Sequence, residues 1–211
     1  VASSSPYNHS PTTRGSAGMQ RQGDIDAYSR SLPSDTQQFL SMTQAAKNRV
    51  TGGESAKIHP ERSSRWFAKA AKDVLDLATQ AEKNLSGHES KEFTSTIADL
   101  RILAGLAQYH SHRLLSGVSW AVFKQTQNPA ALDDAIAHET NAAKAWGNIV
   151  AAAGDIYHND LMMGRRGSGL SGHWKDELAK IEKGLAAMIQ QRKTFKPPPA
   201  DIKPIPPLTV T

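Results

Sequence analysis

The feature of this 211-residue sequence that most constrains its fold is one long helical pattern between about His88 and Thr126. The pattern contains no proline, and the positions of its stripe recur at spacings of three or four residues, which places them on one face of an α-helix. These positions are Leu100, Leu103, Ala107, His110, Leu114, Val118 and Ala121. At 1.5 Å per residue the helix is more than about 50 Å long. Such a helix buries its stripe only against other helices, so the pattern predicts a helical bundle.

Two helices are expected before the long one. Ser34, with Gln37 three residues later, has the pattern of a capping box and predicts a short helix that ends at Gly52 and Gly53. Pro60 suits the first turn of the next helix. Its apolar stripe, expected to face the core, is Trp66, Ala70, Val74, Leu77, Ala81 and Leu85.

Two more helices are expected after it. Asn128-Pro129 predicts a helix start, with Asn as the N-cap and Pro in the first turn, and Gly154 ends that helix. Ser171 is the expected cap of the last helix, in which acidic residues come first and basic residues last, as the helix dipole favours. Inside the long helix, Gly105 and Gly117 indicate the close approach of another helix, or a bend.

These patterns predict an all-α fold, an antiparallel bundle of four main helices with a short fifth. The bundle is expected over residues 34–195. Residues 1–33, rich in Ser, Gly, Thr and Pro, are expected to be an irregular arm or linker. Residues 196–211 contain six prolines and end in Leu-Thr-Val-Thr, which predicts a stiff linker toward a β-rich domain outside this sequence.

Composition excludes several classes of function. The chain has no cysteine, which rules out disulfides, thiolate metal sites and cysteine nucleophiles. Its 25 basic and 20 acidic residues give a net charge of +5, but the two signs alternate along the chain instead of forming the basic cluster of a nucleic-acid-binding protein. No apolar run approaches the length of a membrane span. We therefore expect neither nucleic acid nor a membrane span among its interactions.

No sequence motif of catalysis, cofactor binding or metal binding is present, so no catalytic residue, cofactor or metal is assigned. His110 lies within the apolar stripe of the long helix, and Glu139 lies near the stripe of the next one. If these helices are antiparallel neighbours, the two side chains can meet. A buried polar pair is the favoured interpretation over a proton-transfer site, because no third group or nucleophile accompanies them.

The stretch from Asp155 to Gly172 is long for a loop between bundle helices, and long ordered loops are often functional. Its polar and aromatic side chains are candidates for contact with a ligand or partner protein. Trp120, beside the apolar stripe and expected at the surface, joins them. The full set of candidates is Trp120, Tyr157, His158, Arg165, Arg166 and His173.

Several segments resemble a helical region found in large multidomain bacterial proteins related to glycoside hydrolases. They are Asp99-Leu-Arg-Ile-Leu-Ala104, Ala107-Gln-Tyr-His-Ser-His-Arg113, Ala131-Leu-Asp-Asp-Ala-Ile-Ala-His-Glu139, Ala145-Trp-Gly-Asn-Ile-Val-Ala-Ala-Ala-Gly-Asp155 and Gly172-His-Trp-Lys-Asp-Glu-Leu178. In such proteins the helical region follows a catalytic barrel of the hexosaminidase or α-glucuronidase type. The resemblance implies a secreted or periplasmic parent protein, and it carries over no catalytic residue because the segments are packing patterns.

Three functions are compatible with these sequence patterns and this resemblance. The leading hypothesis is a non-catalytic accessory domain of a carbohydrate-active enzyme, with the neighbouring domains of a larger chain as partners. The second is a carbohydrate-binding module for an acidic or neutral polysaccharide, which requires exposed aromatic side chains near the loop arginines. The third is a helical scaffold for a protein partner, which requires an apolar patch that the bundle leaves uncovered. An independent enzyme is the least favoured class.

Overall fold

A computed structural model describes residues 23–33, 35–87, 90–154, 156–162, 171–198 and 205–210. Its helices are α1 (Ile25–Ser29), α2 (Met42–Thr51), α3 (Pro60–Leu85), α4 (Lys91–Thr126), α5 (Pro129–Ala153) and α6 (Trp174–Thr194). Two strands of two residues each, β1 (Leu161–Met162) and β2 (Ser171–Gly172), pair antiparallel between α5 and α6. The predicted all-α class with four long antiparallel helices is confirmed.

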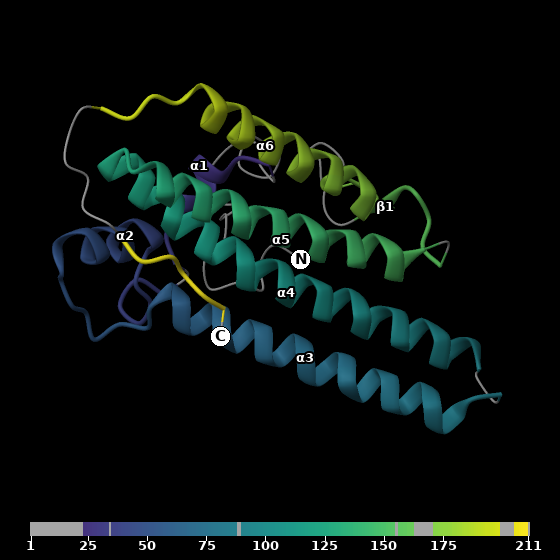
Figure 1. The fold of residues 1–211 in the computed structure, drawn as a ribbon. Coiled ribbons are helices and arrows are strands. Elements are labelled where there is room, and N and C mark those ends of the chain that lie inside the picture. The colour runs from purple at the N-terminus through teal and green to yellow at the C-terminus, as the bar shows by residue number, and fades with distance from the viewer. Residues whose placement is uncertain are drawn as a thin grey trace.

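The four long helices lie side by side in the order α3, α4, α5, α6 (Figure 1). Helix α4 packs against α3 on one side and against α5 on the other, and α6 packs on the far side of α5. The short helices α1 and α2 both pack on α4. The arrangement places α3 at one edge of the array, where α4 is its main neighbour.

Close helix packing explains the interior glycines of α4. A Cβ added at Gly105 would lie 2.7 Å from Cγ1 of Ile149 on α5, and one added at Gly117 would lie 2.4 Å from Sδ of Met42 on α2. Both distances are shorter than any ordinary carbon contact. The predicted close approach of other helices is therefore confirmed at both positions.

Helix starts agree with the sequence where the cap is unambiguous. The side chain of Asn128 caps α5, and Pro129 begins it, as predicted. Helix α2 starts at Met42, because Ser41 and Gln44 form the capping box that the sequence analysis assigned to Ser34 and Gln37. Upstream of Ser41, the chain is held in a bridge between Phe39 and Ile58, so a helix from residue 34 is wrong. Helix α6 is capped by His173 instead of Ser171.

The arm expected at residues 1–33 includes one helix that the sequence analysis missed. Helix α1 is capped by Asp24, and its Ile25 and Tyr28 are buried against α4. Residues 1–22 lie outside the described part of the chain. At the other end, residues 205–210 form neither helix nor strand, and Leu208 is buried among core residues of the bundle. The described end of the tail therefore packs back onto the helices.

The hydrophobic core has two parts. One lies where α1, α2 and residues 205–210 meet the second half of α4 and the first half of α5, and it includes Met42, Leu114, Phe123 and Leu132. The other lies near the β1–β2 pair and includes Tyr109, Trp146, Ile149 and Trp174. None of the helices in the described ranges is both long enough and apolar enough to cross a membrane.

Candidate functional site

A buried ion pair joins α4 to α5. The guanidinium of Arg113 contacts the carboxylate of Glu139, and their side chains are 0% and 1% exposed. The guanidinium also lies over two aromatic rings, 5.0 Å from the centroid of Tyr28 and 5.7 Å from that of Tyr109. Charged side chains are almost never fully buried unless they are paired, so this contact fixes how the two helices face each other.

Burial and pairing shift the pKa values of Glu139 and Arg113 in opposite directions. Burial raises the pKa of the Glu139 carboxyl, and the neighbouring Arg113 and Ser116 oppose that rise without cancelling it. Burial tends to lower the pKa of Arg113, but Glu139 and the tyrosines Tyr109 and Tyr28 hold it above its ordinary value. Arginine stays charged at all physiological pH values, so the pair depends on the ionisation of Glu139.

A second polar group lies beside this pair at the boundary between α4 and α5. The hydroxyl of Ser119 donates to Oδ2 of Asp134 at 2.5 Å, and Oδ1 of Asp134 lies 3.7 Å from Nε2 of His138. The rings of His138 and His112 are 5.9 Å apart between their centroids. Burial, and secondarily the nearby His138, lowers the pKa of His112 to about 4, so His112 is neutral at pH 7.

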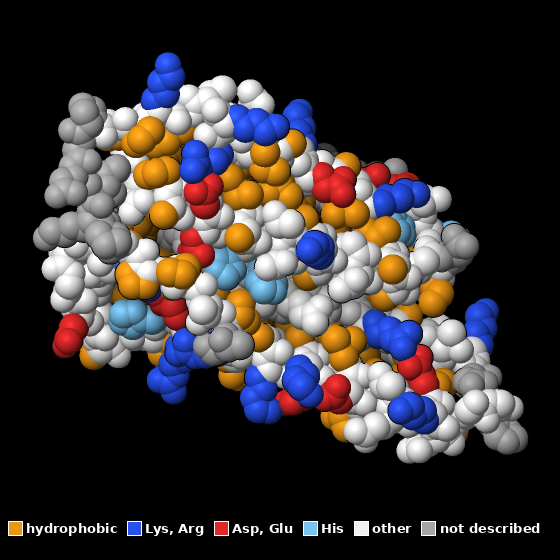
Figure 2. All heavy atoms as spheres, viewed as in Figure 1, with side chains coloured by type: hydrophobic (Ala, Val, Ile, Leu, Met, Phe, Trp, Pro, Cys, Tyr) orange, Lys and Arg blue, Asp and Glu red, His pale blue; other side chains and the backbone are white. Residues whose placement is uncertain are grey.

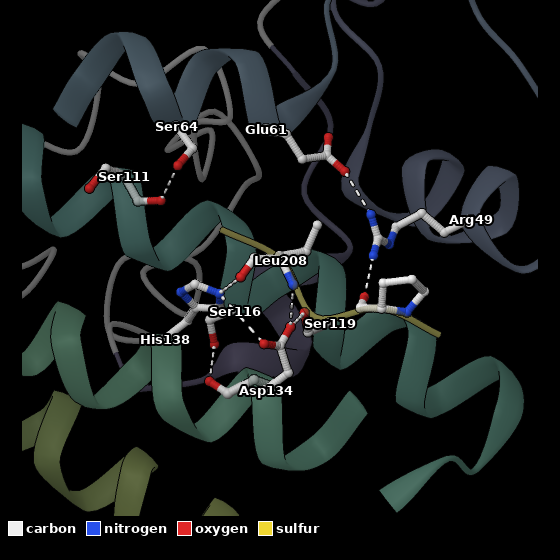
Figure 3. Close-up of polar contacts among 11 residues, drawn as sticks. Arg49, Glu61, Ser64, Ser111, Ser116, Ser119, Asp134, His138 and Leu208 are labelled. Atoms are coloured by element: carbon white, nitrogen blue, oxygen red, sulfur yellow. Dashed lines mark hydrogen bonds and ion pairs between the residues drawn. The ribbon is translucent and has the colours of Figure 1, made fainter. Parts of the chain in front are cut away.

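This group holds the C-terminal segment (Figure 3). Nε2 of His138 donates to the backbone carbonyl of Leu208 at 3.1 Å, and the backbone N–H of Leu208 donates to Oδ2 of Asp134 at 3.3 Å. On α2, Nη2 of Arg49 donates to the carbonyl of Pro206 at 2.6 Å. We name the surface made by Arg49, Ser119, Asp134 and His138 the C-terminal groove. It brings together side chains from α2, α4 and α5.

The C-terminal segment starts beside α2 and ends over the boundary between α3 and α4 in Figure 1. Its side chains add apolar contacts to these polar ones. Leu208 is 7% exposed and belongs to the core, while Ile205 and Val210 pack partly against it. The C-terminal groove is therefore both a polar and an apolar seat for an extended chain.

Trp120, which the sequence analysis expected at the surface, is buried. Its side chain is 5% exposed, and its Nε1 donates to Oδ1 of Asp26 at 3.0 Å. Asp26 lies on α1, so the helix that was missed is the element that covers Trp120. The expectation of an exposed Trp120 is wrong.

The other predicted contact residues separate. Tyr157 donates a hydrogen bond to Asp99 and stacks edge-on against Trp174, with 5.2 Å between the ring centroids. His158 is exposed, whereas His173 is buried and caps α6 through its Nδ1. Arg165 and Arg166 lie outside the described residues. Of these residues, His158 is therefore exposed, Tyr157 is half-buried and His173 caps a helix.

The predicted pair of His110 and Glu139 is corrected by the structure. Both residues are buried, as predicted, but the ion-pair partner of Glu139 is Arg113. His110 lies between aromatic rings, 5.7 Å from Phe67 and 5.2 Å from Tyr109 between centroids. A signal for the true pair was present in the sequence: Arg113 directly precedes Leu114 of the apolar stripe and has the charge that a buried Glu139 requires.

Trp66 is the reverse case, because its position on the apolar stripe predicts a core residue, yet its side chain is 66% exposed. Leu77 on the same helix is 64% exposed, and it follows Trp66 by three helical turns, so the two side chains lie on the same side of α3. Leu103 on α4 is 59% exposed. It precedes His110 by seven residues and so shares the side of α4 that faces Phe67 on α3.

We name Trp66, Leu77 and Leu103 the outer stripe. The half-buried Ala70 and Val74 of α3 lie between its members. Figure 2 shows hydrophobic side chains scattered among charged and other side chains near the boundary between α4 and α3. The outer stripe is exposed because α3 lies at the edge of the array, and no further helix among the described residues covers this side.

Comparison of the sequence with protein-family models, with curated proteins and with solved structures finds no match. Among the residues that the structure describes, no group of three or more His, Asp or Glu side chains is arranged to hold a metal ion. The molecule is an all-α helical protein with two distinctive surfaces, the outer stripe and the C-terminal groove.

Proposed function

We propose that this chain is a helical accessory domain that packs against a neighbouring domain of a carbohydrate-active enzyme through the outer stripe. The observation that carries the proposal is the exposure of Trp66 and Leu77 on one side of α3 and of Leu103 on the side of α4 that faces Phe67. Large apolar side chains that adjoin one another on a surface mark protein–protein contacts, and tryptophan is enriched at their centres.

The carbohydrate-active parent is supported by the sequence resemblance alone. The binding-module alternative loses support because Trp120, its leading aromatic candidate, is buried beneath α1. The scaffold alternative uses the same outer stripe and differs only in whether the partner belongs to the same polypeptide.

Tryptophan fluorescence tests the proposal, because Trp66 is exposed whereas Trp120, Trp146 and Trp174 are buried. In the isolated chain, acrylamide should quench the Trp66 component readily. In the full product of the gene, the same component should be shielded, and a Trp66→Phe variant should remove the difference between the two proteins.

Equal quenching of Trp66 in both proteins would contradict packing through the outer stripe. A gene product without any carbohydrate-active domain would contradict the accessory-domain proposal. If that gene product nevertheless bound a separate protein through the outer stripe, the scaffold function would replace it.

A further inference from the structure

The segment in the C-terminal groove is held mainly through its main chain. Two of its carbonyls, those of Pro206 and Leu208, accept hydrogen bonds from Arg49 and His138. The N–H of Leu208 donates to Asp134. Because a carbonyl can only accept, the Nε2 atom of His138 carries its proton toward the tail.

The two prolines fit this arrangement. Pro206 and Pro207 have no N–H group, so neither needs a hydrogen-bond acceptor from the groove. Both side chains are exposed, whereas Leu208 is buried. Prolines also restrict a free peptide to extended conformations, which reduces the entropy lost when it binds.

Neighbouring side chains hold two polar groups of the C-terminal groove in position. Asp134 is oriented by the hydroxyl of Ser119, and Arg49 is oriented by Glu61, with 3.7 Å between Nη1 and Oε1. These side chains come from α2, α3, α4 and α5. The combination of main-chain hydrogen bonds, proline and one buried apolar side chain is a known mode of peptide recognition.

We propose that the C-terminal groove is a recognition site for an extended peptide that contains Pro-Pro-Leu, and that residues 205–210 of this chain occupy it in cis. The tether gives the tail a high effective concentration at the groove, so a separate peptide binds when the tail is released. This site is separate from the outer stripe and does not depend on the proposed accessory function.

The test uses the full chain with Leu208→Asp, which places a charge where the leucine is buried and so releases the tail. The probe is a fluorescently labelled peptide of the sequence of residues 205–210, with both ends blocked. Fluorescence anisotropy should show binding at least about tenfold tighter to the Leu208→Asp chain than to the unaltered chain, because the intact tail competes.

Changes in the peptide leave the folding of the protein untouched and define the contact. Replacing its leucine by alanine should weaken binding about tenfold or more, since most of the buried apolar surface is lost. Replacing its second proline, the counterpart of the exposed Pro207, should weaken binding only about two- to threefold. In the protein, Arg49→Met should weaken binding by removing the donor to the carbonyl of the peptide's first proline, the counterpart of Pro206.

A second measurement uses the unaltered chain, in case Leu208→Asp disturbs folding. The amide hydrogen of Leu208 is protected by Asp134, so an excess of the peptide should accelerate its exchange by displacing the tail. Amides in the middle of α5 should keep their exchange rates.

Absence of binding by a folded Leu208→Asp chain, with unchanged exchange at Leu208, would overturn the proposal and leave the tail as a structural strap. If the leucine-to-alanine change leaves the affinity of the peptide unchanged, or if both chains bind the peptide equally tightly, the peptide binds elsewhere. Either result would also overturn the proposal.

Discussion

At the end of the α4–α5 pair where α1, α2 and residues 205–210 gather, the interior holds charged and polar side chains, including Arg113, Glu139 and His138. At the opposite end, beside the β1–β2 pair, the interior is mainly apolar and aromatic, with Trp146, Ile149 and Trp174. We call these the tail end and the hairpin end; they lie at opposite ends of the helices in Figure 1.

The pair of helices α4 and α5 thus combines two kinds of contact. The hairpin end gains its stability from burial and close packing, such as that of Gly105 on Ile149. The tail end contains buried polar groups, which stabilise little by themselves but penalise any arrangement that leaves them unpaired. The tail end is therefore where the register of the helices and the position of the tail are specified.

The largest effect is expected from breaking the buried ion pair of the tail end. Glu139→Gln should lower the free energy of unfolding by about 3–5 kcal/mol, because it leaves the charge of Arg113 uncompensated in the interior. Urea unfolding followed by circular dichroism measures the loss. The double variant Arg113→Met with Glu139→Leu should recover most of it, and a loss below about 1 kcal/mol for Glu139→Gln would show that the interior tolerates the lone charge.

Packing at the hairpin end is tested by Gly105→Ala, which should lower the free energy of unfolding by about 1–3 kcal/mol through overpacking against Ile149. Gly147→Ala is the matched control, because a Cβ there meets nothing within 4 Å. The control should raise stability by about 0.5–1 kcal/mol, since alanine favours the helix over glycine. If both changes alter the free energy of unfolding equally, α4 and α5 are less closely packed at Gly105 than its contact with Ile149 indicates.

Acid should weaken the tail end through His112. Its pKa is about 4 in the folded chain and near the ordinary 6.5 in the unfolded chain, so between these values only the unfolded chain takes up the proton. The free energy of unfolding should therefore fall as the pH decreases from about 6.5 to 4. Because His112 is partly exposed, we expect this contribution to be only about 1–2 kcal/mol.

The measurement is a series of urea unfolding curves from pH 7 to pH 4. His112→Gln should flatten the curve of stability against pH in that window, because the variant has no group at this position to titrate. If the stability of His112→Gln depends on pH in the same way as that of the unaltered chain, other groups cause the acid sensitivity.

The smallest effect is expected from an ion pair at the surface. Arg192 on α6 forms two hydrogen bonds with Asp133 on α5, at 2.6 and 3.0 Å, and both side chains are substantially exposed. Arg192→Gln should change the free energy of unfolding by no more than about 0.5 kcal/mol, and high salt should abolish the difference. A loss as large as that of Glu139→Gln would mean that burial is not what separates the two pairs.

The long helices were predictable because their signals are local. The apolar positions of α4 repeat every three or four residues, and the start of α5 is marked by two neighbouring residues, Asn128 and Pro129. The capping box was harder to predict, since Ser34-Gln37 and Ser41-Gln44 have the same spacing. In the structure, Ser41 and Gln44 form the box, and Phe39 just before them pairs with Ile58.

The candidate sites were less predictable because they depend on which elements become neighbours. Trp66 and Trp120 both lie on or beside apolar stripes, yet α3 is left at the edge of the array and α1 covers Trp120. The seat of Leu208 joins side chains far from it in sequence, on α2 and α5, and no local pattern records such a pairing.

The all-α class and the extents of α4 and α5 follow from local signals, because apolar spacing, caps and prolines act within a few residues along the chain. The partner of Glu139, the exposure of Trp66 and the binding of the tail in the C-terminal groove are defined only when the helices pack together. Those outcomes depend on the order and register of packed helices, which arise from many weak contacts between residues distant in the sequence.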